Sequence, residues 1–318
     1  MNNYEKLSVK MAINLANPPT WVASVIPSVF GVLFCFRYGL GLGLFKSIAL
    51  ILVCILMQSA VNTLNDYFDY VKGTDQKTDN LEVSDAVLLY NNINPQHALF
   101  LGLGYLAAAA VLGIICAFGC GPIPYILGII GGLCVVFYSG GKYPISYFPV
   151  GELISGVVMG AFIPLAIVSI ALGTSHIDMP GSYLIVLLQS IPFVIGIALI
   201  MMTNNTCDIE KDIEAGRKTF PSISGREKSV KIYRSLSKLW FAWILVMGIL
   251  SYSNIESIIL LFVFEIFLAR KKFRFLWTSP LTPNNRINQM KGIIAANIYG
   301  NGLYTFIVFF DALIAIAK

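Results

Sequence analysis

Residues 62–75 read NTLNDYFDYVKGTD, and the residues before them, 48–61, read IALILVCILMQSAV. A run with almost no polar side chains therefore ends abruptly in three aspartates and two asparagines. Ionisable side chains at the end of a membrane-spanning segment are costly to bury and need a partner. They therefore usually mark a functional site. The pair of stretches predicts a membrane-spanning helix that carries a charged functional site at its end.

The composition points to the same class of protein. Of the 318 residues, 57% are hydrophobic and only 12% are charged, whereas a soluble domain carries about 25% charged residues. The mean hydropathy is +0.75. The first twenty residues contain no continuous apolar core and no small-residue cleavage site, so we expect no signal peptide. The composition excludes an ordinary soluble domain and predicts a polytopic membrane protein.

Nine segments come close to the roughly 20 apolar residues that a spanning helix needs. They are residues 20–43, 45–65, 97–118, 121–140, 150–173, 183–205, 233–252, 255–270 and 293–316. We therefore predict an all-α membrane protein of about nine transmembrane helices, with residues 1–318 forming a single domain.

The basic residues predict how these helices are oriented. With the N-terminus in the cytoplasm, four loops share its side of the membrane, near residues 66–96, 141–149, 206–232 and 271–292. All 22 basic residues except Arg37, Lys46 and Lys318 then lie on that side, as the positive-inside rule requires. The sequence thus predicts a multi-pass protein of the cell (inner) membrane with its long polar loops on the cytoplasmic side.

A second polar cluster ends another apolar segment, where residues 201–220 read MMTNNTCDIEKDIEAGRKTF. Residues three or four apart share one face of a helix. Each cluster then presents an Asn-Asp-Asp ridge, and the two ridges consist of Asn62, Asp66 and Asp69 and of Asn204, Asp208 and Asp212. Both ridges fall on the predicted cytoplasmic side.

Carboxylates stacked on one helix face repel each other unless a cation neutralises them. Hard oxygen ligands suit Mg²⁺, which binds through a few carboxylates together with substrate phosphates. The two ridges therefore predict a site that holds a diphosphate between metal ions. Two alternatives remain open: these residues serve as helix caps and loop solubilisers, or they bind the coupling cation of a secondary transporter.

Four stretches together resemble the UbiA-type family of intramembrane prenyltransferases. They are NPPTWVASVIPSVFG (17–31), NDYFDYVKGTD (65–75), YSGGKYPISYFPVGEL (138–153) and NNTCDIEKDIEAGRKT (204–219). NDYFD resembles the family's NDxxD-type first motif, and DIEKD (208–212) resembles its DxxxD second motif. The resemblance covers nearly the whole chain and implies a UbiA-like fold of nine helices around a central cavity.

Within the family the chain looks most like the 1,4-dihydroxy-2-naphthoate polyprenyltransferase (MenA) branch of menaquinone biosynthesis. This resemblance implies Mg²⁺-dependent transfer of a polyprenyl group from an allylic polyprenyl diphosphate to an aromatic acceptor. The implied partners are the diphosphate donor, a dihydroxynaphthoate-like acceptor and the lipid bilayer, with no nucleic acid. A UbiA-type enzyme with a hydroxybenzoate, haem, chlorin or lipid-glycerol acceptor remains an alternative.

The resemblance also implies roles for individual residues. The expected metal-binding and catalytic acids are Asp66, Asp69, Asp208 and Asp212. Tyr138 is expected either to stabilise an allylic carbocation with its ring or to belong to the interfacial aromatic belt. The expected substrate-binding residues are Asn62, Asn65, Lys72, Asp75, Lys142, Glu152, Asn204, Arg217 and Lys218. Among them Lys72, Lys142, Arg217 and Lys218 would form a clamp for the phosphate oxygens. Glu152 would position the acceptor, take a proton or cap its helix.

Overall fold

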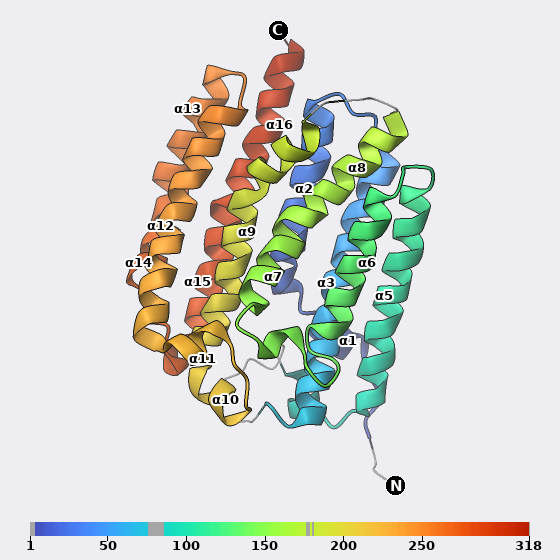
Figure 1. Ribbon diagram of the computed structural model, residues 1–318, viewed down its shortest axis with the longest axis vertical. Coiled ribbons are helices and arrows are strands. Elements are labelled where there is room, and N and C mark those ends of the chain that lie inside the picture. The colour runs from blue at the N-terminus through green and yellow to red at the C-terminus, as the bar shows by residue number, and fades with distance from the viewer. Residues whose placement is uncertain (1–3, 76–85, 176–178, 180, 318) are drawn as a thin grey trace.

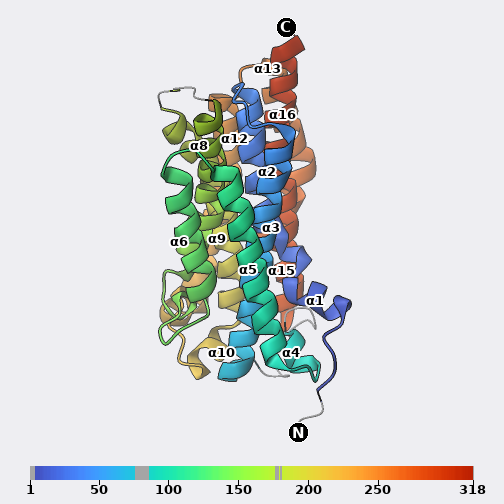
Figure 2. The same ribbon diagram turned by 90° about the vertical axis from the view of Figure 1, so that its right-hand side faces the viewer.

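The computed structural model describes residues 4–75, 86–175, 179 and 181–317. In this part of the chain the regular elements are all helices, apart from one isolated bridge between Glu5 and Ile93. The helices form an elongated bundle (Figures 1 and 2). Residues 76–85 of the predicted cytoplasmic loop, which include Lys77, lie outside the described residues, and so does Lys318.

Long helices joined by short ones make up the bundle. In chain order they are α1 (Val9–Ala16), η1 (Pro18–Trp21), α2 (Val22–Arg37), α3 (Leu44–Lys72), α4 (Val87–Tyr90), α5 (Pro95–Ala117), α6 (Ile123–Phe137), η2 (Ile145–Tyr147), α7 (Gly151–Val157), η3 (Val158–Phe162), α8 (Ile163–Ser175), α9 (Ser182–Cys207), α10 (Ile209–Glu214), α11 (Phe220–Ser224), α12 (Arg226–Ser251), α13 (Ile255–Phe264), η4 (Glu265–Ala269), α14 (Arg270–Thr278), η5 (Pro283–Asn285), α15 (Arg286–Tyr299) and α16 (Asn301–Ala317). The elements η3 and η4 are short π-helices.

Each of the nine predicted segments is helical, which confirms the all-α prediction. Within the described residues, seven helical stretches are long and apolar enough to cross a membrane. The fourth predicted segment corresponds to α6, which has only 15 residues. The eighth corresponds to α13 and η4, which run on into the basic helix α14. The chain is thus a multi-pass membrane protein.

A glycine in the left-handed backbone conformation ends α3 and positions the first motif. Gly73 has φ +66°, a conformation that favours glycine because it lacks a Cβ. Its N–H donates to Tyr70, and the N–H of Thr74 donates to the carbonyl of Asp69. The helix therefore stops one turn after Asp69, and the chain turns so that Asp75 lies beside the same site.

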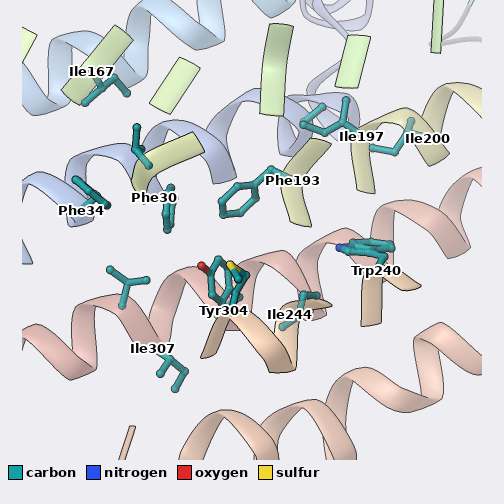
Figure 3. Close-up of a cluster of buried hydrophobic side chains, with 14 of the residues drawn as sticks. Phe30, Phe34, Ile167, Phe193, Ile197, Ile200, Trp240, Ile244, Tyr304 and Ile307 are labelled. Atoms are coloured by element: carbon teal, nitrogen blue, oxygen red, sulfur yellow. The ribbon is translucent and has the colours of Figure 1, made fainter. Parts of the chain in front are cut away.

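Buried aromatic rings join the two halves of the bundle. The ring centroids of Phe30 on α2 and Phe193 on α9 are 4.8 Å apart, and Tyr304 on α16 lies 5.8 Å from Phe30. Figure 3 shows these rings together with Trp240 of α12. All four side chains have no exposed surface. Their packing holds α9 at the centre, between the N-terminal and C-terminal helices.

Glycines let α7 and η3 approach α9 at backbone distance. A Cβ added at Gly160 would lie 2.5 Å from the amide nitrogen of Val194, and one at Gly156 would lie 2.6 Å from its carbonyl oxygen. Contacts this short cannot be relieved by turning a side chain. The close approach depends on glycine at both positions, as is common where membrane helices pack.

Replacing Gly160 with alanine should destabilise the bundle. The added methyl group would push η3 away from α9, which costs about 1–3 kcal/mol in a well-packed interior. Gly104→Ala on α5 is the matched control, because a Cβ there has no neighbour within 4 Å. Thermal unfolding in detergent measures both variants, and equal melting temperatures for the two would contradict the packing described.

Candidate active site

The two acidic ridges lie at the same end of the bundle and face each other. The first is on the last turns of α3, and the second runs from the end of α9 into α10, the lower end of the molecule in Figure 1. Arg217 joins them, since its Nη2 forms an ion pair with Asp69 and its Nη1 lies 3.9 Å from an oxygen of Asp212. Asn65 also donates to Asp69, over 3.0 Å.

Asp75 and Lys211 form a second link between the motifs. Their Nζ–Oδ1 distance is 2.5 Å. Burial of Lys211 opposes its charge, but the carboxylate of Asp75 outweighs this, so the pKa of Lys211 is raised. Burial also raises the pKa of Asp212 to about 6, although Thr219 donates to it over 2.9 Å. The second motif is thus largely removed from water.

Arg286, the first residue of α15, holds the start of the second ridge. Its Nε lies 3.1 Å from Asp208, and its Nη2 donates to Asn204 over 2.6 Å. Neither Arg286 nor Lys211 was among the site residues predicted from the sequence. Arg286 is 78 residues from Asp208 in sequence, so only the packing of α15 against α9 reveals it. Its place at the predicted cytoplasmic end of the last apolar segment was the one available signal.

Asp66 and Asn62 hold neighbouring backbone segments. The carboxylate of Asp66 accepts from the amides of Val87 and Leu88, at 2.6 and 3.2 Å, and so anchors the short helix α4. Asn62 donates to the carbonyl of Ala16 over 2.8 Å. These bonds fix the segments that border the first motif.

The other predicted residues differ in how close they lie to the ridges. Lys72 donates to the carbonyl of Ser139 over 2.7 Å. Glu152 is buried and accepts from Asn205 over 2.9 Å. Lys142 and Lys218 are exposed. Of the residues predicted to hold phosphate, Arg217 contacts the acids of the ridges, and the roles of Lys72, Lys142 and Lys218 stay predictions.

A cavity of about 380 Å³ opens between the ridges. The predicted residues that line it are Asn62, Asn65, Asp66, Asp69, Asp75, Tyr138, Asn204, Asp208 and Arg217. Those outside its lining are Lys72, Lys142, Glu152, Asp212 and Lys218. Lys211 and Arg286 line it as well. The cavity thus brings both motifs to one polar mouth.

The rest of the cavity is mostly apolar and extends far into the bundle. Its lining on α3 reaches from Asp69 back to Leu50, a length of roughly 28 Å at the rise of an α-helix. Leu127 of α6 and Ile167 of α8 line the same space. A ligand with a charged head and a long apolar tail matches this shape.

The donor atoms at the mouth suit Mg²⁺. Asp69, Asp75 and Asp208 offer carboxylate oxygens, and Asn65 and Asn204 offer amide oxygens. Mg²⁺ binds through one or two carboxylates plus phosphates and waters, and needs no complete protein cage. In the described part of the chain no three His, Cys, Asp or Glu side chains come together as a metal site. The carboxylates are held apart instead, each against a cation or an amide.

Residues 24–292 match the UbiA prenyltransferase family. The chain belongs to the UbiA prenyltransferase family. It is therefore a membrane prenyltransferase, and the secondary-transporter alternative is set aside. The match includes the whole of both ridges and the start of α15.

Two curated relatives show how far this similarity extends. The 1,4-dihydroxy-2-naphthoate octaprenyltransferase of Bacillus subtilis (strain 168) is 30% identical over 231 residues, which is 72% of this prenyltransferase and 71% of the relative. The UbiA prenyltransferase domain-containing protein 1 of Homo sapiens is 26% identical over 223 residues, covering 69% of this chain and 62% of the human protein.

Solved structures share the fold. A UbiA homolog from Archaeoglobus fulgidus bound to DMAPP and Mg²⁺ superposes with a TM-score of 0.56 at 18% identity, covering 94% of this chain and 98% of that chain. The apo structure of a UbiA homolog from Aeropyrum pernix K1 gives 0.62 at 13% identity, covering 93% and 98%. These neighbours confirm the predicted UbiA-like architecture.

Removing Arg217 should destabilise the prenyltransferase in the absence of metal. Arg217→Ala leaves Asp69 and Asp212 buried without their shared cation, and breaking such a pair costs about 3–5 kcal/mol. Lys218→Ala is the matched control, because the neighbouring Lys218 is exposed and such changes stay within about 0.5 kcal/mol. Unfolding midpoints in detergent measure both, and an equal effect for the two variants would contradict the bridging role.

Proposed function

We propose that the prenyltransferase transfers a polyprenyl group from an allylic polyprenyl diphosphate to an aromatic acceptor, namely 1,4-dihydroxy-2-naphthoate in menaquinone biosynthesis, in a reaction that requires Mg²⁺. The observation that supports it is the pair of acidic ridges, joined by Arg217, at the mouth of a long apolar cavity. The charged mouth matches the diphosphate of this donor, and the apolar cavity matches its polyprenyl chain.

The acids at the mouth would hold the metal. Bound Mg²⁺ would neutralise the charge of the diphosphate and so make it a better leaving group. Asp69 and Asp75 would bind on the first side and Asp208 on the second. Asp212 lies outside the cavity lining and accepts from Thr219, so its metal-binding role stays a prediction. Asp66 was also predicted to bind metal, and its role stays a prediction, since its carboxylate now accepts from two backbone amides.

Three basic side chains would exchange partners when substrate binds. Arg217, Lys211 and Arg286 each form an ion pair with an acid of the motifs. With those acids engaged in holding the metal, the three cations would be available to the oxygens of the diphosphate. Charge-assisted hydrogen bonds of this kind stabilise charge that develops on a leaving group.

The apolar arm of the cavity would hold the start of the isoprenoid chain and exclude water. Water must be kept away because it would capture an allylic carbocation. Tyr138 lines the cavity beside the mouth, where the face of its ring would stabilise the cation. The ring carbon that carries the acceptor's carboxylate would then form the new bond to the prenyl carbon that has lost diphosphate, and the carboxylate would leave as carbon dioxide. Glu152 would position the acceptor through Asn205, which lines the cavity.

The naphthoate acceptor is supported by the Bacillus subtilis relative, whose name specifies that acceptor. The carboxylate of such an acceptor would be attracted by the cations at the mouth. The orientation with the active-site loops on the cytoplasmic side of the cell membrane is supported by the excess of basic residues at that end.

Removing an acid from either ridge should sharply lower turnover. Asp69→Ala and Asp208→Ala should each lower the rate by a factor on the order of 10²–10³, the usual cost of losing one element that stabilises developing charge. Because departure of the diphosphate precedes attack, the loss should be the same with 1,4-dihydroxy-2-naphthoate and with 4-hydroxybenzoate. Diphosphate release and product mass measure the reaction.

The control is Glu214→Ala, an exposed acid of α10 outside the cavity lining. It should retain nearly the wild-type rate. Activity that persists in EDTA would contradict the proposed requirement for Mg²⁺. Conversion of 4-hydroxybenzoate in preference to 1,4-dihydroxy-2-naphthoate would overturn the acceptor while leaving prenyl transfer intact.

A further inference from the structure

The outer face of α13, η4 and α14 changes from apolar to basic at one level. This segment lies along one edge of the bundle (Figure 1). Ile255, Ile259, Val263 and Phe267 follow one another at four-residue intervals and are all exposed, Phe267 by 76%. These positions share one helix face, so an apolar strip about 18 Å long runs along the segment.

The next positions on the same face are cations. Arg270, Lys271 and Arg274 are all exposed. Arg270 and Lys271 lie one turn after Phe267, and Arg274 lies one turn further on. The opposite face of α14 is apolar and buried, with Phe273 packed 4.6 Å from Trp240. The three cations therefore lie together at the edge of the strip, where a bilayer would change from acyl chain to headgroup.

No acid neutralises these cations in the described part of the chain. None of the ion pairs found there includes Arg270, Lys271 or Arg274. Glu265 is the nearest acid in the segment, but its side chain is fully buried on the other side of the helix. The patch thus carries three positive charges next to an apolar surface.

A groove connects the two parts of this face. It is a shallow, open depression lined by Ile266, Phe267, Arg270, Lys271 and Arg274, which all belong to η4 and α14. The π-helix η4 (Glu265–Ala269) lies directly beneath it. Such π-helical turns widen a helix and often occur at functional sites. The groove combines an apolar wall with a cationic end.

We propose that this groove binds one anionic phospholipid. The phosphate would lie against Arg270, Lys271 and Arg274, and an acyl chain would lie along Phe267, Val263 and Ile259. Charge complementarity favours this occupant, because basic pockets at the membrane surface bind anionic headgroups. The site is separate from the catalytic cavity, whose lining shares no residue with it.

Native mass spectrometry of the purified full chain, titrated with phosphatidylglycerol or phosphatidylcholine, tests the proposal. The wild type should retain phosphatidylglycerol in preference to phosphatidylcholine. The triple variant Arg270→Gln, Lys271→Gln, Arg274→Gln should lose this preference, since each cation near an anionic lipid contributes about fivefold in affinity and three contribute on the order of 100-fold.

Two further variants separate this site from general charge effects. Lys10→Gln, Lys228→Gln, Lys231→Gln removes three other exposed cations and should keep the preference. A third triple variant, Arg270→Lys, Lys271→Arg, Arg274→Lys, retains the three positive charges. It should also retain the preference for phosphatidylglycerol. The proposal is overturned if the first triple variant still prefers phosphatidylglycerol, if the Lys10 triple variant loses the preference equally, or if the wild type has none.

Discussion

The site depends on one guanidinium placed between two sets of acids. Arg217 reaches Asp69 on α3 and Asp212 on α10, and without it two buried carboxylates would face each other at the end of a membrane bundle. Lys211 and Arg286 provide the same neutralisation for Asp75 and Asp208. These cations offset the repulsion between the acids, so carboxylates of both motifs can surround one cavity mouth.

The bundle around this site explains why the reaction suits a membrane protein. Aromatic packing through Phe30, Phe193 and Tyr304 fixes α9 in the centre, and Gly156 and Gly160 bring α7 and η3 against it. The apolar part of the cavity, lined by α3, α6 and α8, runs from the acids into the bundle. A substrate with a charged head and a long isoprenoid tail would place each part in a matching environment.

Much of this could be predicted from sequence, because apolar segments and helical spacing are local properties. The helices, both Asn-Asp-Asp ridges and the family resemblance are visible in single stretches of the chain. Arg286 was missed because it meets Asp208 only after α15 packs beside α9. Lys142 and Lys218 were predicted for the clamp from their closeness in sequence, yet they are exposed outside the cavity lining. Side-chain direction in loops depends on tertiary contacts that spacing does not contain.

The most direct test is a structure of the protein with Mn²⁺ and a non-hydrolysable polyprenyl thiodiphosphate, with the metal located by anomalous scattering. We predict Mn²⁺ bound to carboxylates of both ridges at about 2.1 Å, the tail in the apolar arm, and Arg217 moved from Asp69 to the diphosphate. Metal bound away from the ridges, or Arg217 still paired with Asp69 while the diphosphate lies elsewhere, would contradict this mechanism.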